Sequence, residues 1–80
     1  MKVQDILTDE GKWCQGSLSM RNEDGTYRHC LVGALLELPN AQIAVAKIHE
    51  RIGLMSISAW NDAPERTFPE VRALIEELDI

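Results

Sequence analysis

The sequence predicts a small, mainly α domain of the α+β class, with about four helices and one short β-hairpin near residues 15–30. Apolar residues recur at helical spacing in several segments. A turn signal at 22–25 separates two segments of strand-like residues, and Gly or Pro marks most of the other boundaries. Because a chain of 80 residues can build one hydrophobic core only, we expect residues 1–80 to form a single domain.

The first element is expected to be a short helix over residues 2–10. Val3, Ile6 and Leu7 share helical spacing, and Gly11 follows as an expected left-handed stop. A helix this short is marginal alone, so its apolar side must pack on the rest of the chain.

A hairpin is expected from residues 15–21 and 26–30. Leu18 and Met20 alternate with polar residues, and the Asn-Glu-Asp-Gly turn at 22–25 contains residues that tolerate positive φ. Because two strands alone are unstable, we expect helices to cover one face of this hairpin.

A buried central helix is predicted over residues 30–38, a run that is almost wholly apolar and is ended by Pro39. Gly33 and Ala34 would let another element approach this helix closely. The next helix is predicted over 41–52. Asn40 is expected to cap that helix, and Gly53 to end it. Its apolar face comprises Ala41, Ala44, Val45, Ile48 and Ile52.

The segment 54–66 fits either a short helix capped by Ser56 or a strand, and the helix is preferred. The last helix follows a predicted capping box, in which Thr67 and Glu70 bond each other's amides and Pro69 occupies the first turn. The apolar stripe of this helix comprises Val71, Leu74, Ile75 and Leu78.

Charge and hydropathy exclude several function classes. The formal net charge is −5, and the eight Lys and Arg residues are scattered, so direct nucleic-acid binding is not expected. No apolar run has the length of a signal peptide or a membrane span, so we expect a cytoplasmic protein with no membrane contact. In that reducing compartment Cys14 and Cys30 are expected to be free thiols.

Cys30 is the most reactive candidate, because amide dipoles at the start of the buried helix would lower its thiol pKa. A Cys–His–Asn hydrolase could be assembled from Cys30, His49 and Asn61, with Asp62 as an alternative third group. The favoured interpretation is that Cys30 is a small core residue. Cys14, His29, Cys30 and His49 lack the paired spacing of zinc ligands, so neither a metal nor a cofactor is predicted.

Two tryptophans followed by polar residues are the other candidates. The favoured interpretation is structural: Trp13 and Trp60 anchor irregular segments, while Asn61 and Asp62 bond backbone in the following turn. The functional alternative is a polar and aromatic groove that binds a ligand or peptide. Its candidate binding residues are Trp13, Gln15, Trp60, Asn61 and Asp62.

The same residues form a longer pattern over about residues 10–78. Its motifs are Trp13-x-Gln15-Gly16, Asp24-Gly25, Cys30-x-x-Gly33-Ala34-Leu35 and Trp60-Asn61-Asp62-Ala63-Pro64-x-Arg66-Thr67, followed by Glu70-Val71 and Leu74. The pattern resembles a family of short uncharacterised bacterial and phage proteins, a domain of unknown function. The resemblance implies a shared fold and no activity. The place of such proteins among phage genes suggests host-directed or anti-defence roles.

The leading functional hypothesis is therefore a small acidic, non-enzymatic interaction protein that binds another protein, with a phage-encoded modulator or inhibitor of a host defence system as the suggested setting. Small size, acidity and an incomplete set of catalytic or metal-binding residues support it. The alternative is a small cysteine-dependent enzyme or small-ligand-binding module that uses Cys30 and the Trp13/Trp60 region.

Overall fold

Five helices and a small hairpin follow one another along the chain in the order that the sequence predicts. The computed structural model describes all 80 residues, and its five α-helices and antiparallel hairpin confirm the α+β class. The elements are α1 (Val3–Ile6), the 3-10 turn η1 (Glu10–Lys12), β1 (Ser19–Arg21), β2 (Tyr27–His29), α2 (Leu31–Leu35), α3 (Ala41–Ile52), α4 (Ile57–Asp62) and α5 (Phe68–Leu78).

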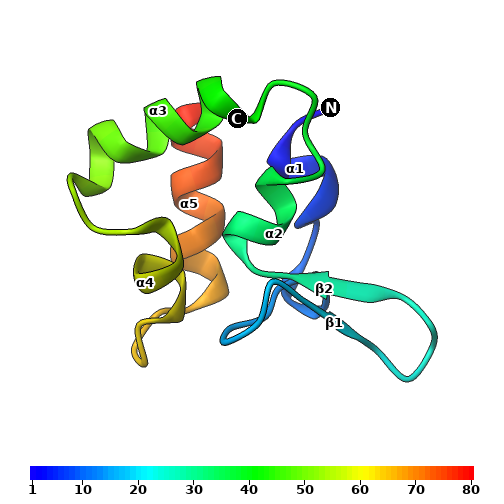
Figure 1. Ribbon diagram of the computed structural model, residues 1–80. Helices are drawn as coiled ribbons and strands as arrows, with labels where there is room; N and C mark the ends of the chain where they lie inside the picture. The colour runs from blue at the N-terminus through cyan, green and yellow to red at the C-terminus, as the bar shows by residue number, and fades with distance from the viewer.

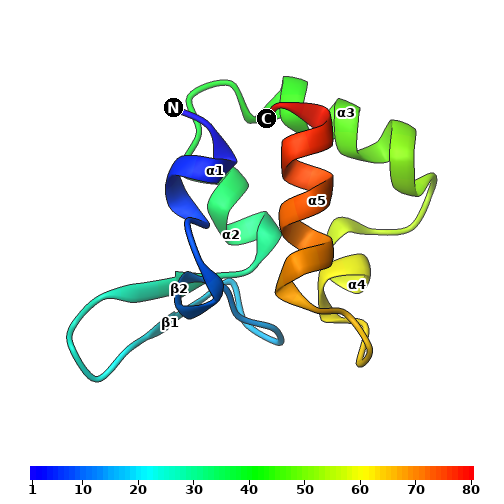
Figure 2. The same ribbon diagram turned by 180° about the vertical axis from the view of Figure 1, so that it is seen from behind.

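Helix α5 lies between the other helices (Figures 1 and 2). It contributes Phe68, Val71, Leu74 and Ile75 to the hydrophobic core. It packs against α1 on one side and α3 on the other, while α2 contacts α4. The predicted stripe of α5 is buried at Val71, Leu74 and Ile75. The core side chains are Val3, Leu7, Trp13, Leu31, Ala34, Leu35, Ala44, Ile48, Ile57, Phe68, Val71, Leu74, Ile75 and Ile80. No helix is both long enough and apolar enough to span a bilayer.

The capping box at the start of α5 is present. The Glu70 carboxylate accepts a hydrogen bond from the amide of Thr67 at 3.1 Å and another from its hydroxyl at 3.2 Å. Arg66 also donates to this carboxylate, at 2.9 Å. The Glu70 carboxylate therefore accepts most of the hydrogen bonds at this cap, and the Thr67 hydroxyl acts mainly as a donor to it.

The middle helices begin and end close to their predicted limits. Helix α3 spans Ala41–Ile52 as expected, and Gly53 ends it with φ 74°. Ser56 caps α4, its hydroxyl accepting from the amide of Ala59 at 3.0 Å. The predicted Asn40 cap is wrong, because Asn40 lies at φ −123°, ψ 52°, outside the extended conformation that lets a cap side chain reach the first amides.

The two apolar segments near the N-terminus form shorter helices than expected. Helix α1 ends at Ile6 instead of residue 10, because Asp9 starts a separate 3-10 turn by accepting from the Gly11 amide at 2.8 Å. Gly11 lies inside that turn and is not the left-handed stop that the sequence suggested. Helix α2 covers Leu31–Leu35 only, and the rest of the apolar run turns toward α3.

The hairpin departs most from expectation. Met20 pairs with Arg28 and Arg21 with Tyr27 in an antiparallel register, and the hairpin projects from the helices in both views (Figures 1 and 2). Every residue of the two strands is exposed except His29, which is intermediate. The expectation that helices cover one face was wrong, because only the base of the hairpin meets α2, next to Gly33.

Candidate functional site

The segment 13–16 lies against the C-terminal half of α4, although more than forty residues separate them in sequence. Asn61, on α4, is fully buried between the two segments. Four of the five predicted binding residues meet here through direct hydrogen bonds, and Trp60 lies next to them in sequence.

The side-chain amide of Asn61 uses its whole hydrogen-bonding capacity. Its Oδ1 accepts from the indole Nε1 of Trp13 at 2.7 Å and from the amide of Leu31 at 3.0 Å. Its Nδ2 donates to the carbonyl of Cys14 at 3.1 Å and to the Asp62 carboxylate at 2.9 Å. A side-chain amide offers two lone pairs and two N–H groups, so all four are matched.

Gln15 and Gly16 complete the contact from the other side. The Gln15 Nε2 donates to the carbonyls of Asn61 and Ala63, each at 2.9 Å. The Gly16 amide donates to the Asp62 carboxylate at 3.0 Å, and Gly16 adopts φ 84°, a conformation that favours glycine. We call Trp13, Gln15, Gly16, Asn61 and Asp62 the motif clasp.

The Trp60 side chain makes no hydrogen bond to the motif clasp and contacts Arg66 instead. The Arg66 guanidinium lies 3.9 Å from the centre of its ring, and Arg66 Nε donates to the Trp60 carbonyl at 2.9 Å. Such stacking stabilises a cation against an aromatic face. Trp13, by contrast, sits in the core with its ring centroid 6.1 Å from that of Phe68.

The motif clasp is therefore a cross-link between distant segments of the chain. No buried side-chain nitrogen or oxygen in the structure is without a hydrogen-bond partner. An open pocket of about 350 Å³ lies beside the motif clasp and is lined by Glu10, Gly11, Trp13, Cys14, Gln15 and Arg28. Asn61 and Asp62 bond the segment 13–16 instead of the turn that follows them. The sequence predicted most of these residues as candidates. It did not predict the backbone groups of Cys14, Leu31 and Ala63, because a backbone amide or carbonyl is the same in every residue type.

Cys30 lies at the start of α2, as the sequence predicts. Its Sγ accepts from the Gly33 amide at 3.3 Å, and the residue is only 4% exposed. Asn61 lies nearby through its bond to Leu31, but His49 is exposed on the last turn of α3 with its Nδ1 3.0 Å from the Gly53 carbonyl. No hydrogen bond joins His49 to Cys30.

The second thiol is also protected. Both cysteines are free and buried. Burial, together with the nearby Cys30, raises the pKa of the Cys14 thiol, and this disfavours the reactive thiolate. No three His, Cys, Asp or Glu side chains gather closely enough to hold a metal ion.

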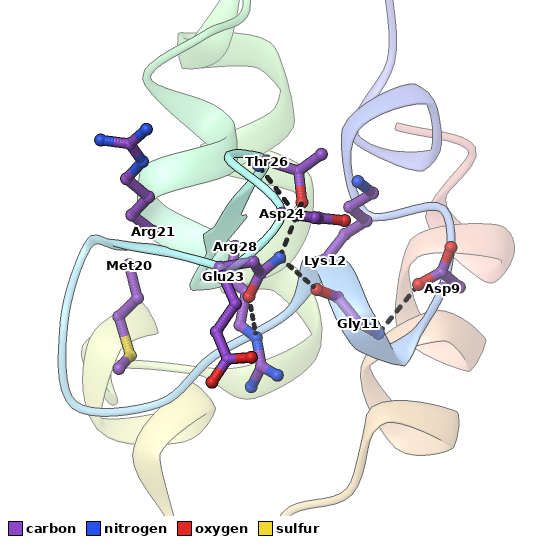
Figure 3. A pocket seen from close by; sticks show the side chains of 10 residues that line it. Asp9, Gly11, Lys12, Met20, Arg21, Glu23, Asp24, Thr26 and Arg28 are labelled. Atoms are coloured by element: carbon purple, nitrogen blue, oxygen red, sulfur yellow. Dashed lines mark hydrogen bonds between the residues drawn. The ribbon is translucent and has the colours of Figure 1, made fainter.

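A second candidate region is an open hollow of about 800 Å³ between η1 and the hairpin (Figure 3). We call it the hairpin hollow. It is lined by Asp9, Gly11, Lys12, Met20, Arg21, Asn22, Glu23, Asp24, Thr26 and Arg28. Met20 is the only apolar side chain among them.

The Lys and Arg side chains of the hairpin hollow differ from the others in the chain in how they are paired. The four ion pairs of the chain use Lys2, Arg51, Arg66 and Arg72, and Lys47 donates to the Leu78 carbonyl. The remaining three, Lys12, Arg21 and Arg28, all line the hollow and form no ion pair. Sequence reasoning missed this hollow, because nothing near Lys12 in the sequence indicates that η1 packs against the hairpin.

Two carboxylates of the hairpin hollow already accept hydrogen bonds from groups of the chain itself. Asp24 accepts from the hydroxyl and the amide of Thr26, and these two bonds hold the pKa of the Asp24 carboxyl below its usual value. Asp9 accepts from the Gly11 amide. The Asn22 side chain links the hairpin to η1. It accepts a hydrogen bond from Arg28 Nε at 2.7 Å and donates one to the Gly11 carbonyl at 3.3 Å.

Comparison with known proteins gives one match. A search of curated proteins and of solved structures finds no similar protein. The model of a family of unknown function, DUF6197, matches residues 1–78, which include every residue of the motif clasp and of the hairpin hollow. We conclude that the chain belongs to the family of unknown function DUF6197.

Proposed function

We propose that this chain is a small acidic, non-enzymatic interaction protein that binds another protein through its hairpin. The observation that carries the proposal is the exposure of apolar side chains on both faces of a projecting hairpin. Leu18 is 51% exposed, Met20 47% and Tyr27 54%. A folded chain gains nothing by itself from leaving these side chains in water.

The composition of the hairpin also supports a protein partner. Single exposed apolar residues are ordinary, but here several share one short element with Arg21 and Arg28. Tyr, Met and Arg are enriched where proteins meet.

The cysteine-dependent alternative has weaker support. Cys30 is nearly inaccessible and has no histidine partner, and the Asn61 amide is fully used inside the motif clasp. Labelling with iodoacetamide at neutral pH separates the two functions. An interaction protein should label at Cys30 only after denaturation, whereas native labelling faster than that of free cysteine would favour the enzyme.

The suggested setting comes from the family resemblance alone. In a phage setting, the proposed activity would make the chain a modulator or inhibitor of a host defence system in the cytoplasm. The identity of the captured partner tests this setting.

Affinity capture tests the proposed function. The tagged chain is mixed with a bacterial lysate at low and high salt, and bound proteins are identified by mass spectrometry. We expect one stoichiometric partner, which the Met20→Thr/Tyr27→Thr variant loses. Threonine keeps the strand preference of these positions while removing the large apolar surface.

A matched control uses two exposed apolar residues outside the hairpin. Leu36, at the C-terminal end of α2, is 69% exposed, and Ile43, on α3, is 62% exposed. The Leu36→Gln/Ile43→Gln variant should keep the partner. Equal capture by the wild type and the hairpin variant, or no partner at either salt concentration, would contradict the proposal.

A further inference from the structure

The outer edge of β1 has unused backbone hydrogen-bonding groups. The sheet has two strands only, and β2 carries the bridge to Trp13 on its other side. The amide of Cys30 bonds the carbonyl of Leu18, and the amide of Asn22 bonds the carbonyl of Thr26. Since bonding direction alternates along a strand, the amides and carbonyls of Ser19 and Arg21 point away from β2.

These groups have no partner in the chain. No other element lies along β1, and no turn, loop or side-chain hydrogen bond involves the backbone of Ser19 or Arg21. An open strand edge of this kind can pair with a strand from another protein.

The side chains around this edge specify what kind of strand would fit. Arg21 makes no hydrogen bond or ion pair, and only the Nε of Arg28 is used, so the terminal nitrogens of both guanidinium groups are free. They lie on opposite faces of the hairpin, because Arg21 pairs with Tyr27 and Arg28 with Met20. Each face thus offers one free guanidinium beside one exposed apolar side chain.

We propose that an extended, acidic segment of a partner protein adds to the free edge of β1 as a third strand. Its backbone bonds the outward groups of Ser19 and Arg21, and its carboxylates bind the guanidinium groups of Arg21 and Arg28. Charge-assisted pairs between Arg and carboxylates are strong and directional. Apolar residues of the added strand would contact Met20 and Tyr27. This inference rests on the proposed function and specifies its partner.

A second copy of the chain fits the edge less well. A symmetric β1–β1 contact would place the two Arg21 guanidinium groups on the same face of the new sheet, where like charges repel.

The experiment has two stages. A displayed library of random heptapeptides is selected on the wild-type protein and counter-selected on the Arg21→Glu/Arg28→Glu variant. We expect the enriched peptides to contain Asp or Glu together with β-branched residues. The best synthetic peptide should bind the charge-reversed variant at least about tenfold more weakly.

Amide hydrogen exchange then tests strand addition itself. In the free protein the outward amides of Ser19 and Arg21 should exchange fast, while the Met20 amide is already protected by β2. Saturation with the peptide should protect Ser19 and Arg21 and leave Met20 unchanged. The Leu36→Gln/Ile43→Gln variant should give the same protection as the wild type.

Several results would overturn the inference. These are enrichment of peptides without acidic residues, no enrichment at all, or binding without protection of Ser19 and Arg21. Protection that grows with protein concentration alone would assign the edge to a second copy, and tighter binding of a 20-nucleotide single strand than of any peptide would assign it to nucleic acid. Partner capture that depends on Met20 and Tyr27 could survive any of these results, so failure here is distinguishable from failure of the proposed function.

Discussion

At the scale of single residues, Asn61 is the most constrained side chain. It is fully buried, and its amide bonds groups from three parts of the chain. An alanine there would leave the indole N–H of Trp13 and the backbone amide of Leu31, both in buried residues, without their present partner. Each unmatched buried group costs about 1–3 kcal/mol.

We therefore expect Asn61→Ala to lower the free energy of unfolding by roughly 2–5 kcal/mol, as measured by urea denaturation. Asn40→Ala is the matched control, because Asn40 is exposed and makes no cap bond. That variant should change stability by less than about 0.5 kcal/mol. A small effect at Asn61 would mean that the motif clasp does not hold the two segments together.

Gly33 gives a second prediction at this scale. A Cβ added there would lie 2.0 Å from the backbone carbonyl oxygen of Leu18, where the base of the hairpin meets α2. Backbone cannot move aside as a flexible side chain can, so Gly33→Ala should destabilise the chain by at least about 1–3 kcal/mol.

The control for this prediction is Gly11→Ala, whose Cβ would meet only a side-chain atom, the carboxylate oxygen of Asp9 at 3.0 Å. Its thermal unfolding temperature should fall less than that of Gly33→Ala. Equal unfolding temperatures for the two variants would show that α2 and the hairpin can separate without cost.

At the scale of elements, the start of α5 makes stability depend on pH. The Thr67 amide, and after it the Thr67 hydroxyl and Arg66, hold the pKa of the Glu70 carboxyl below its usual value. Because the pKa is lower in the folded chain than in the unfolded chain, this contribution is complete above the unfolded pKa. It is lost as pH falls through the folded pKa.

Glu70→Gln should therefore destabilise the protein at neutral pH, and the difference from the wild type should shrink on acidification to about pH 3. Urea denaturation across this pH range measures it. Glu50→Gln, which alters an exposed residue with no ion pair, should show no such trend. A difference at Glu70 that stays constant with pH would contradict the assigned role of its carboxylate.

Local sequence signals predicted the elements unevenly, for physical reasons. Helix α3 and the start of α5 were predictable, because their apolar spacing and their Gly53 and Glu70 signals act within a few residues. Helix α1 was overestimated, because the Asp9 side chain competes with helix continuation by starting a turn of its own. The uncovered hairpin contradicted the argument that two strands alone are unstable and therefore need helices over one face.

At the scale of the whole molecule, contacts between distant segments fix the fold. The N- and C-terminal segments are joined by a 2.7 Å bond from the Val3 amide to the Ile80 carbonyl and by an ion pair of Lys2 with Asp79. The motif clasp joins segments 13–16 and 61–63. Sequence patterns pointed to the residues of the motif clasp but not to their pairing, because nothing local to Trp13 indicates that its indole meets Asn61.

The central claim is that one set of residues holds the fold together and a different set contacts the partner. Trp13 and Asn61 of the motif clasp are buried and hold distant segments together, whereas Met20 and Tyr27 on the hairpin are about half exposed and, in the proposed function, contact the partner.

The most direct test is the free energy of unfolding of the Met20→Thr/Tyr27→Thr variant, measured by urea denaturation beside the wild type. The account predicts a change of less than about 1 kcal/mol, as for exposed positions without structural contacts. A loss of about 2 kcal/mol or more would show that these side chains support the fold, and would contradict their assignment to a partner.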